Sequence, residues 1–147
     1  MATSGTGSPR PAFPNEGGSA GAAASRPAAS TQWRVLIVDD SADDAELARI
    51  ELHGAGIAAE CRRADSEASL LATLLEFAPQ LVLSDLNMPG FSGEHAFAIV
   101  RERAPSARFV LLTGALEEDA ALPSVDAVLL KHELHALPGL VRKLLGC

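Results

Sequence analysis

The chain lacks the features that mark secreted and membrane proteins. It has only two cysteines in 147 residues, Cys61 and Cys147, which are too few for a disulfide framework and indicate unpaired thiols in a reducing compartment. No apolar run approaches the roughly 18–20 residues that a membrane span needs. The N-terminus also lacks the apolar core of a signal peptide. We therefore expect a soluble, cytoplasmic protein that has no membrane partner.

Basic residues are also scarce. The chain has 12 Lys and Arg against 19 Asp and Glu, which gives a formal net charge of -7. A nucleic-acid-binding domain favours a basic face, so we expect no nucleic-acid partner. An acidic chain remains well suited to binding cations.

Large apolar residues are almost absent from the first part of the chain. Residues 1–32 are nearly all Ala, Gly, Ser, Pro and Thr, with Phe13 and no Leu, Ile or Val. Such a segment cannot bury enough apolar surface to offset the entropy of ordering it. We predict a disordered tail over residues 1–32 and a folded domain over residues 33–147.

Within the predicted domain, apolar runs alternate with helical patterns. Strands are predicted at residues 34–38, 57–63, 81–84, 108–112 and 125–130. Helices are predicted at residues 41–53, 66–77 and 93–104, with at most a short helix at 117–122 and a last apolar stripe over 134–145. This alternation predicts an α/β domain with a parallel sheet and helices on both of its faces. In such folds the functional site lies at the carboxyl ends of the strands.

The predicted strand ends carry an unusual set of side chains. Asp39 and Asp40 follow the first strand and Asp85 the third, whereas Thr113 ends the fourth and Lys131 the fifth. Two carboxylates about 5 Å apart repel by roughly 3 kcal/mol at an effective dielectric of about 20, and a cation between them relieves this repulsion. Mg²⁺ suits such an oxygen-rich site. An aspartate can attack phosphorus, and an ammonium group and a hydroxyl can stabilise the transferring oxygens.

Four short strings carry a specific resemblance. Val38-Asp-Asp-Ser41, Leu83-Ser-Asp-Leu-Asn-Met-Pro-Gly90, Thr113-Gly114 and Leu129-Leu-Lys131 resemble, in order and near the expected spacing, the CheY-like receiver domain of two-component signalling. The resemblance covers about residues 34–145. It implies a doubly wound, five-stranded parallel sheet of the flavodoxin-like (CheY-like) type, with strand order 2-1-3-4-5.

The resemblance also implies a Mg²⁺ site. Asp39 and Asp40 would hold the ion, one of them through water, and Asp85 would be a further metal ligand. Asn87 would offer its main-chain carbonyl to the metal and turn its side chain toward the phosphoryl group.

The phosphoryl site is implied in the same way. Asp85 would be the phosphoacceptor, and Thr113 and Lys131 would contact the phosphoryl oxygens. The implied donor is a phosphohistidine on a histidine kinase or a histidine phosphotransfer protein, and some members also accept phosphoryl groups from small acyl phosphates. The domain would catalyse only its own phosphorylation and dephosphorylation, so we do not expect an enzyme with an external product.

Two positions and one stretch of residues depart from the family pattern. Many receivers have an aromatic residue three positions before the lysine, where this chain has Val128. Many have proline after the lysine, where this chain has His132, and without proline we expect a trans or strained peptide bond, because cis costs about 3 kcal/mol. The stretch from Thr113 to Lys131 is shorter than usual and contains Pro123. We hypothesise that any switch runs through residues 113–122.

Two other functions remain open. One is a receiver-shaped interaction scaffold that is not phosphorylated, although the intact acidic set argues against it. The other is a Mg²⁺-dependent phosphohydrolase of the haloacid-dehalogenase type, but that family places its nucleophilic aspartate on the first strand and usually adds a cap domain. No DNA-binding region follows the predicted receiver before Cys147. We therefore expect output by protein contact with an unknown partner, by competition for phosphoryl groups, or through a region outside this sequence.

Overall fold

The computed structural model describes residues 32–115 and 124–146. Residues 33–147 form a compact unit. The predicted tail therefore lies outside the described residues except for Gln32, and the predicted short helix at 117–122 lies outside them entirely. Both stay predictions.

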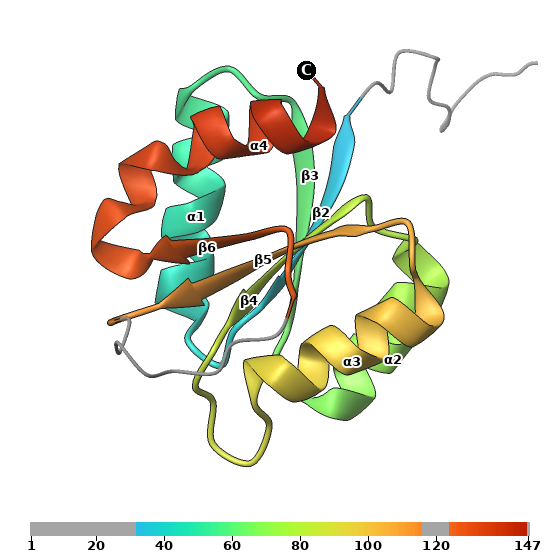
Figure 1. The fold of residues 1–147 in the computed structure, drawn as a ribbon. Helices are drawn as coiled ribbons and strands as arrows, with labels where there is room; N and C mark the ends of the chain where they lie inside the picture. The colour runs from blue at the N-terminus through green and yellow to red at the C-terminus, as the bar shows by residue number, and fades with distance from the viewer. Residues whose placement is uncertain (1–31, 116–123, 147) are drawn as a thin grey trace, which may run out of the picture. The chain divides into compact units, whose positions relative to one another are not determined.

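A five-stranded parallel sheet forms the centre of the domain. Its strands run in the spatial order β3-β2-β4-β5-β6 (Figure 1). They are β2 (Trp33–Val38), β3 (Ala59–Ala64), β4 (Leu81–Asp85), β5 (Arg108–Thr113) and β6 (Ala127–Leu130). Counted along the chain this order is 2-1-3-4-5, so the predicted strand order and fold class are confirmed.

Helices cover both faces of the sheet. They are α1 (Ala42–Gly54), α2 (Glu67–Phe77), α3 (Gly93–Arg103), the 3₁₀ helix η1 (Lys131–Ala136) and α4 (Leu137–Leu145). In Figure 1, α1 and α4 lie on one side of the sheet and α2 and α3 on the other. None of the helices in the described ranges is long and apolar enough to cross a membrane.

The apolar core is divided by the sheet into two clusters. Alternate residues of each strand point to opposite faces, so neighbouring side chains of β2 enter different clusters. Val35 and Ile37 pack toward α1 and α4, whereas Leu36 and Val38 pack toward α2 and α3. All four are at most 2% exposed, as expected for a strand covered on both faces.

Serine residues begin the three longer helices that follow strands. Ser41 caps α1, Ser66 caps α2 and Ser92 caps α3, each accepting a hydrogen bond from a main-chain N–H of the first turn. These caps fix where each chain segment leaves the sheet and turns into a helix. The loop residues between the strand ends and these caps are therefore held at the carboxyl edge of the sheet.

The chain after β6 matches two of the sequence-based expectations. The looser turn expected before Pro138 is η1, and Pro138 is the second residue of α4, one position later than predicted. No peptide bond in the described ranges is cis, so the bond between Lys131 and His132 is trans, as expected in the absence of proline. Val128 lies on β6 and packs against the cluster on the α2 and α3 side.

Candidate functional site

Three carboxylates from two strand ends meet at the carboxyl edge of the sheet. Asp39 and Asp40 follow β2, and Asp85 is the last residue of β4, the neighbouring strand. Each offers a carboxylate oxygen, and these oxygens all lie within 4.8 Å of one another. Three hard oxygen ligands this close together suit a Mg²⁺ ion, which binds through carboxylates while keeping several waters.

Asp39 is the most deeply buried of the three. It is only 1% exposed. Its Oδ1 accepts a hydrogen bond from the Ser41 main-chain N–H at 2.9 Å, and Arg63 donates to its main-chain carbonyl at 3.0 Å. Burial raises the pKa of Asp39, and the Ser41 N–H and the Lys131 ammonium offset only part of this rise. A buried carboxylate of this kind is stabilised in its ionised form by a nearby cation.

Lys131 supplies a positive charge to this cluster from the end of β6. Its Nζ lies 3.3 Å from Asp85 Oδ2, 3.4 Å from Asp39 Oδ2 and 2.8 Å from Asp44 Oδ2. Burial by itself lowers the pKa of Lys131. The hydrogen bond to Asp44 and the charges of Asp39 and Asp85 outweigh that effect, so the pKa is raised and the ammonium stays charged at neutral pH.

The loop after Asp85 is held by main-chain contacts. Asn87 donates its main-chain N–H to Asp85 Oδ1 at 3.2 Å, and Gly93 donates its N–H to the Leu86 carbonyl at 2.8 Å. A Cβ added at Gly93 would lie 2.5 Å from the Asp85 carbonyl oxygen and 2.8 Å from the Leu86 Cα. The first residue of α3 therefore packs directly on the backbone that carries Asp85, and only glycine fits there.

Thr113 has a different environment from the one its predicted role requires. It ends β5 and is 1% exposed. Its hydroxyl donates to the Ala115 main-chain carbonyl at 2.9 Å. To donate to a phosphoryl group on Asp85, this hydroxyl would have to give up that bond. The role of Thr113 stays a prediction, as does that of the exposed Asn87 side chain.

The sequence analysis missed two residues of this site. Asp44 reads in the sequence as one of two acids in the first turn of a helix, a common stabilising pattern. Gly93 reads as the start of the next helix. A partner for Asp44 could be found only by placing α1 beside the end of β6, because Asp44 and Lys131 are 87 positions apart.

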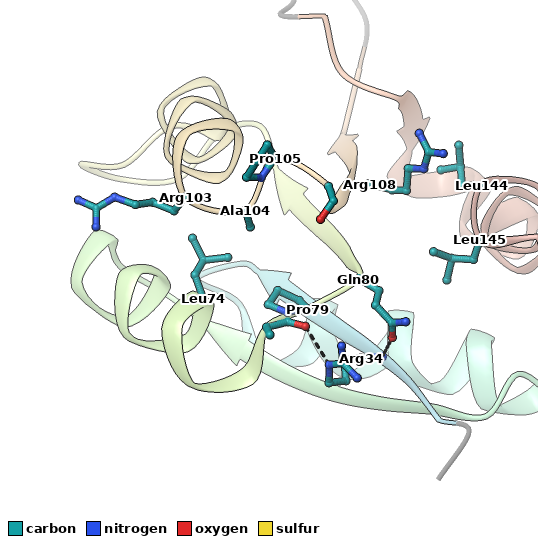
Figure 2. Close-up of a pocket in the computed structure, with 12 residues that line it drawn as sticks. Arg34, Leu74, Pro79, Gln80, Arg103, Ala104, Pro105, Arg108, Leu144 and Leu145 are labelled. Atoms are coloured by element: carbon teal, nitrogen blue, oxygen red, sulfur yellow. Dashed lines mark hydrogen bonds between the residues drawn. The ribbon is translucent and has the colours of Figure 1, made fainter. Parts of the chain in front are cut away.

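A cavity of about 580 Å³ lies at the opposite, amino-terminal end of the sheet (Figure 2). Arg34, Arg103 and Arg108 line it. Arg34 donates from Nε to the Ala78 carbonyl at 2.8 Å, and Arg108 lies 3.6 Å from Asp126 Oδ1. In Figure 2, Arg103 extends away from the other labelled side chains. The three guanidinium groups therefore do not converge on one ligand position.

Comparison with known proteins finds similarity to a transcriptional regulator. The chain is 30% identical over 88 residues to the DNA-binding transcriptional regulator NtrC of Escherichia coli K12, a match covering 60% of this chain and 18% of NtrC. The chain thus spans about a fifth of the length of the curated relatives that it matches.

Solved structures give the same result. The response regulator TrrA of Thermotoga maritima, in complex with Mg²⁺ and beryllium fluoride, is 29% identical with a TM-score of 0.67, covering 77% of this chain and 99% of TrrA. The receiver domain of AraT, a response regulator from Geobacillus stearothermophilus, is 26% identical with a TM-score of 0.62, covering 78% of this chain and 95% of that domain.

The family comparison covers the strand ends described above. Residues 35–131, from β2 to Lys131, match the response regulator receiver domain. Receiver domains take part in two-component signalling, interact with histidine kinases and are not a conventional enzyme family. An acidic triad such as Asp39, Asp40 and Asp85 is typical of their Mg²⁺ site. With its sheet order, its acidic triad and its lysine at the end of β6, this chain belongs to the response regulator receiver domain family.

Proposed function

We propose that Asp85 accepts a phosphoryl group from a phosphohistidine on a histidine kinase or histidine phosphotransfer protein, with Mg²⁺, and that the domain then signals by protein contact. One observation carries this proposal. The Asp85 carboxylate lies 3.3 Å from the Lys131 ammonium and within 4.8 Å of the Asp39 and Asp40 carboxylates. A nucleophile, a fixed positive charge and a metal-ligating set are thus together in one place.

The acidic triad fits the metal by its chemistry. Asp39, Asp40 and Asp85 would hold Mg²⁺, and the main-chain carbonyl of Asn87 would be the further ligand. When bound, the ion supplies positive charge beside the transferring phosphoryl oxygens. Support comes from Asp39, whose pKa is raised by burial and whose ionised form a bound cation would stabilise. The related TrrA, in its complex with Mg²⁺ and beryllium fluoride, supports the same assignment.

The transfer itself is a displacement at phosphorus. A carboxylate oxygen of Asp85 forms a bond to phosphorus while the P–N bond of the donor phosphohistidine breaks, and the imidazole leaves and takes up a proton. Lys131 would neutralise charge on the phosphoryl oxygens, since its ammonium already lies beside Asp85. Thr113 would donate its hydroxyl to one of these oxygens after leaving the Ala115 carbonyl.

The partners are proposed by class only. The donor is a histidine kinase or a histidine phosphotransfer protein, and the output partner is another protein. Because the chain spans 18% of NtrC, the DNA-binding function named for NtrC is not carried over. A cytoplasmic location belongs to the proposal, because two isolated cysteines fit a reducing compartment.

The experiment is a phosphorylation assay with a matched control. Wild-type chain, Asp85→Asn and Glu102→Gln are incubated with acetyl phosphate and Mg²⁺ and separated on a gel that retards phosphoproteins. The expected result is a retarded band for the wild type and for Glu102→Gln, whose exposed carboxylate lies on α3. Asp85→Asn should give no retarded band, because its side-chain amide lacks the nucleophilic carboxylate that accepts the phosphoryl group.

Other outcomes favour the alternatives. If neither acetyl phosphate nor a phosphohistidine donor modifies the wild type, the chain is better explained as a phosphorylation-independent interaction scaffold. Multiple turnover of a phosphate ester would instead favour a phosphohydrolase. The position of Asp85 argues against the haloacid-dehalogenase type, because β4 is the third strand of the sheet along the chain rather than the first.

A further inference from the structure

The Lys131 ammonium is shared among three carboxylates, and the nearest belongs to a residue outside the acidic triad. The Nζ to Oδ2 distance is 2.8 Å for Asp44, against 3.3 Å for Asp85 and 3.4 Å for Asp39. Asp44 lies in the first turn of α1, and it is not part of the metal-ligating group found among the described residues. Lys131 is therefore held from two sides, by the phosphorylation site and by α1.

The surroundings of the pair keep it partly shielded from water. A small cavity of about 40 Å³ adjoins the two side chains, and Leu47 of α1 and Leu134 of η1 also line it. The Lys131 side chain is 28% exposed and that of Asp44 is 42% exposed. The attraction within a partly buried pair is screened less by water and salt than that of a fully exposed pair.

The two groups of carboxylates respond differently to the proposed chemistry. A cation held by Asp39 and Asp85 would neutralise much of their negative charge and so weaken their attraction for the Lys131 ammonium. Asp44 would keep its full attraction for the ammonium. A phosphoryl group on Asp85 would then compete with Asp44 for the same ammonium, which already lies beside both residues.

From this we infer that Asp44 is a positioning residue that holds Lys131 in the unphosphorylated domain and competes with the phosphoryl group for it. The inference rests on the proposed function, since it concerns the same site. Asp44 acts through Lys131 and does not contact the reacting atoms. Its effect is to make the phosphorylated state less favourable than it would be with a free lysine.

The preceding residue, Asp43, offers a matched control for a purely structural role of Asp44. Acids in the first turn of a helix stabilise it by interacting with the helix dipole, and Asp43 and Asp44 both lie there. Asp43 is exposed, and no ion pair involves it within the described part of the chain. Asp43→Asn therefore removes the same charge from the same turn without removing a partner of Lys131.

The test measures the affinity for beryllofluoride, a phosphoryl mimic, at saturating Mg²⁺. The proteins compared are the wild type, Asp44→Asn, Asp43→Asn, Lys131→Met and the double variant Asp44→Asn with Lys131→Met. Asp44→Asn should bind beryllofluoride about two- to five-fold more tightly than Asp43→Asn, the range that a partly exposed ion pair accounts for. In the Lys131→Met background the Asp44→Asn change should have no effect.

A second readout uses the same proteins without metal or mimic. Urea unfolding should show a lower midpoint for Asp44→Asn than for the wild type, because the ion pair is lost. In the Lys131→Met background Asp44→Asn should lower the midpoint less than it does in the wild type, because the ion pair is already lost and only the interaction of Asp44 with the helix dipole remains.

Three outcomes would overturn the inference. They are equal affinities for Asp44→Asn and Asp43→Asn, weaker binding by Asp44→Asn, and an effect of Asp44→Asn that persists without Lys131. The second would mean that Asp44 prepares Lys131 for the phosphoryl group, and the third that it acts through space on the anion. A wild-type chain that neither binds beryllofluoride nor accepts a phosphoryl group would overturn the proposed function as well, so the two failures are distinguishable.

Discussion

The two ends of the sheet arrange their charged side chains in opposite ways. At the carboxyl end, the Lys131 ammonium lies within 3.4 Å of three carboxylates, those of Asp39, Asp44 and Asp85. Asp40, the remaining acid of the triad, adds further negative charge. At the amino-terminal end, Asp126 is surrounded by its own donors. Its Oδ2 accepts from the Phe109 main-chain N–H at 2.7 Å and from Arg101 at 2.9 Å.

The two ends of the sheet differ in whether their carboxylates are already paired with positive charge. The amino-terminal end has a cavity of about 580 Å³, but its carboxylate already has the positive charge that it needs. Burial alone would raise the pKa of Asp126, and the hydrogen bonds from Phe109 and Arg101 outweigh burial and lower it. Among the described residues, the carboxyl end has more carboxylates than ammonium groups, and a further cation would balance this excess. Unbalanced charge therefore distinguishes the end of the sheet that carries the candidate functional site.

The largest expected effect comes from removing the cation at the carboxyl end. Lys131→Met should slow phosphorylation by acetyl phosphate about 100-fold, the usual cost of losing one group that stabilises charge in a transition state. Rates are measured from the retarded band over time. Arg108→Met removes a cation at the amino-terminal end and should leave the rate unchanged. Equal slowing in both variants would contradict the distinction between the two ends.

The next effect concerns the backbone under Asp85. Gly93→Ala would force a Cβ to within 2.5 Å of the Asp85 carbonyl oxygen, so the loop must shift. We expect the free energy of unfolding to fall by up to about 3 kcal/mol, the upper end for overpacking. Gly139→Ala is the control, because nothing lies within 4 Å of its added Cβ. Urea unfolding of both variants tests this, and similar midpoints would show that the loop yields easily.

Asp126→Ala should destabilise the amino-terminal end of the sheet without changing the rate of phosphorylation at the carboxyl end. It leaves the Phe109 N–H and Arg101 without their acceptor, which costs about 2 kcal/mol of unfolding free energy. Phosphorylation of the folded variant should proceed at the wild-type rate. A slowed rate at temperatures where the variant is fully folded would mean that the two ends are coupled.

The stabilisation by Asp126 should also depend on pH in a defined direction. Its pKa in the folded state is lowered from the ordinary value of 3.8. The unfolded chain therefore takes up the proton first as pH falls, and stability decreases between 3.8 and the lowered value. The difference in unfolding free energy between wild type and Asp126→Ala should be constant above this window and shrink within it.

The smallest effect expected is that of Mg²⁺ on stability. At ten times its dissociation constant, Mg²⁺ should stabilise the folded domain by about 1.4 kcal/mol, because it binds the folded state alone. Asp39→Asn should lose this response, since one carboxylate of the triad is gone. Asp126→Asn changes the same group at the other end and should keep the response. Thermal unfolding with and without Mg²⁺ measures both, and a response that survives Asp39→Asn would remove that residue from the metal site.

Most of the fold was predictable because its signals are local. The buried strands appear as apolar runs such as 34–38 and 81–84, and a serine cap such as Ser41 begins a helix where the pattern expects one. The weak strand predicted at 57–63 begins two residues later and ends one residue later, as β3 (Ala59–Ala64). That strand lies at the sheet edge, where the apolar pattern is incomplete.

The candidate site was predictable only in part. Parallel strands bring their carboxyl ends to one edge, so the meeting of Asp39, Asp40 and Asp85 follows from the strand pattern once the strand order is known. The direction of the Thr113 hydroxyl does not follow from any pattern, because a hydroxyl can rotate toward any nearby acceptor. It donates to Ala115, two residues further along the chain.

The sequence by itself determined which residues end each strand, and with them the chemistry available at the carboxyl edge. Only the tertiary structure decided how Lys131 divides its charge among Asp39, Asp44 and Asp85. An ammonium group on a flexible four-carbon stem can reach several acceptors, and no local pattern says which it will choose. The choice depends on where α1 packs relative to the end of β6, which is a property of the assembled core.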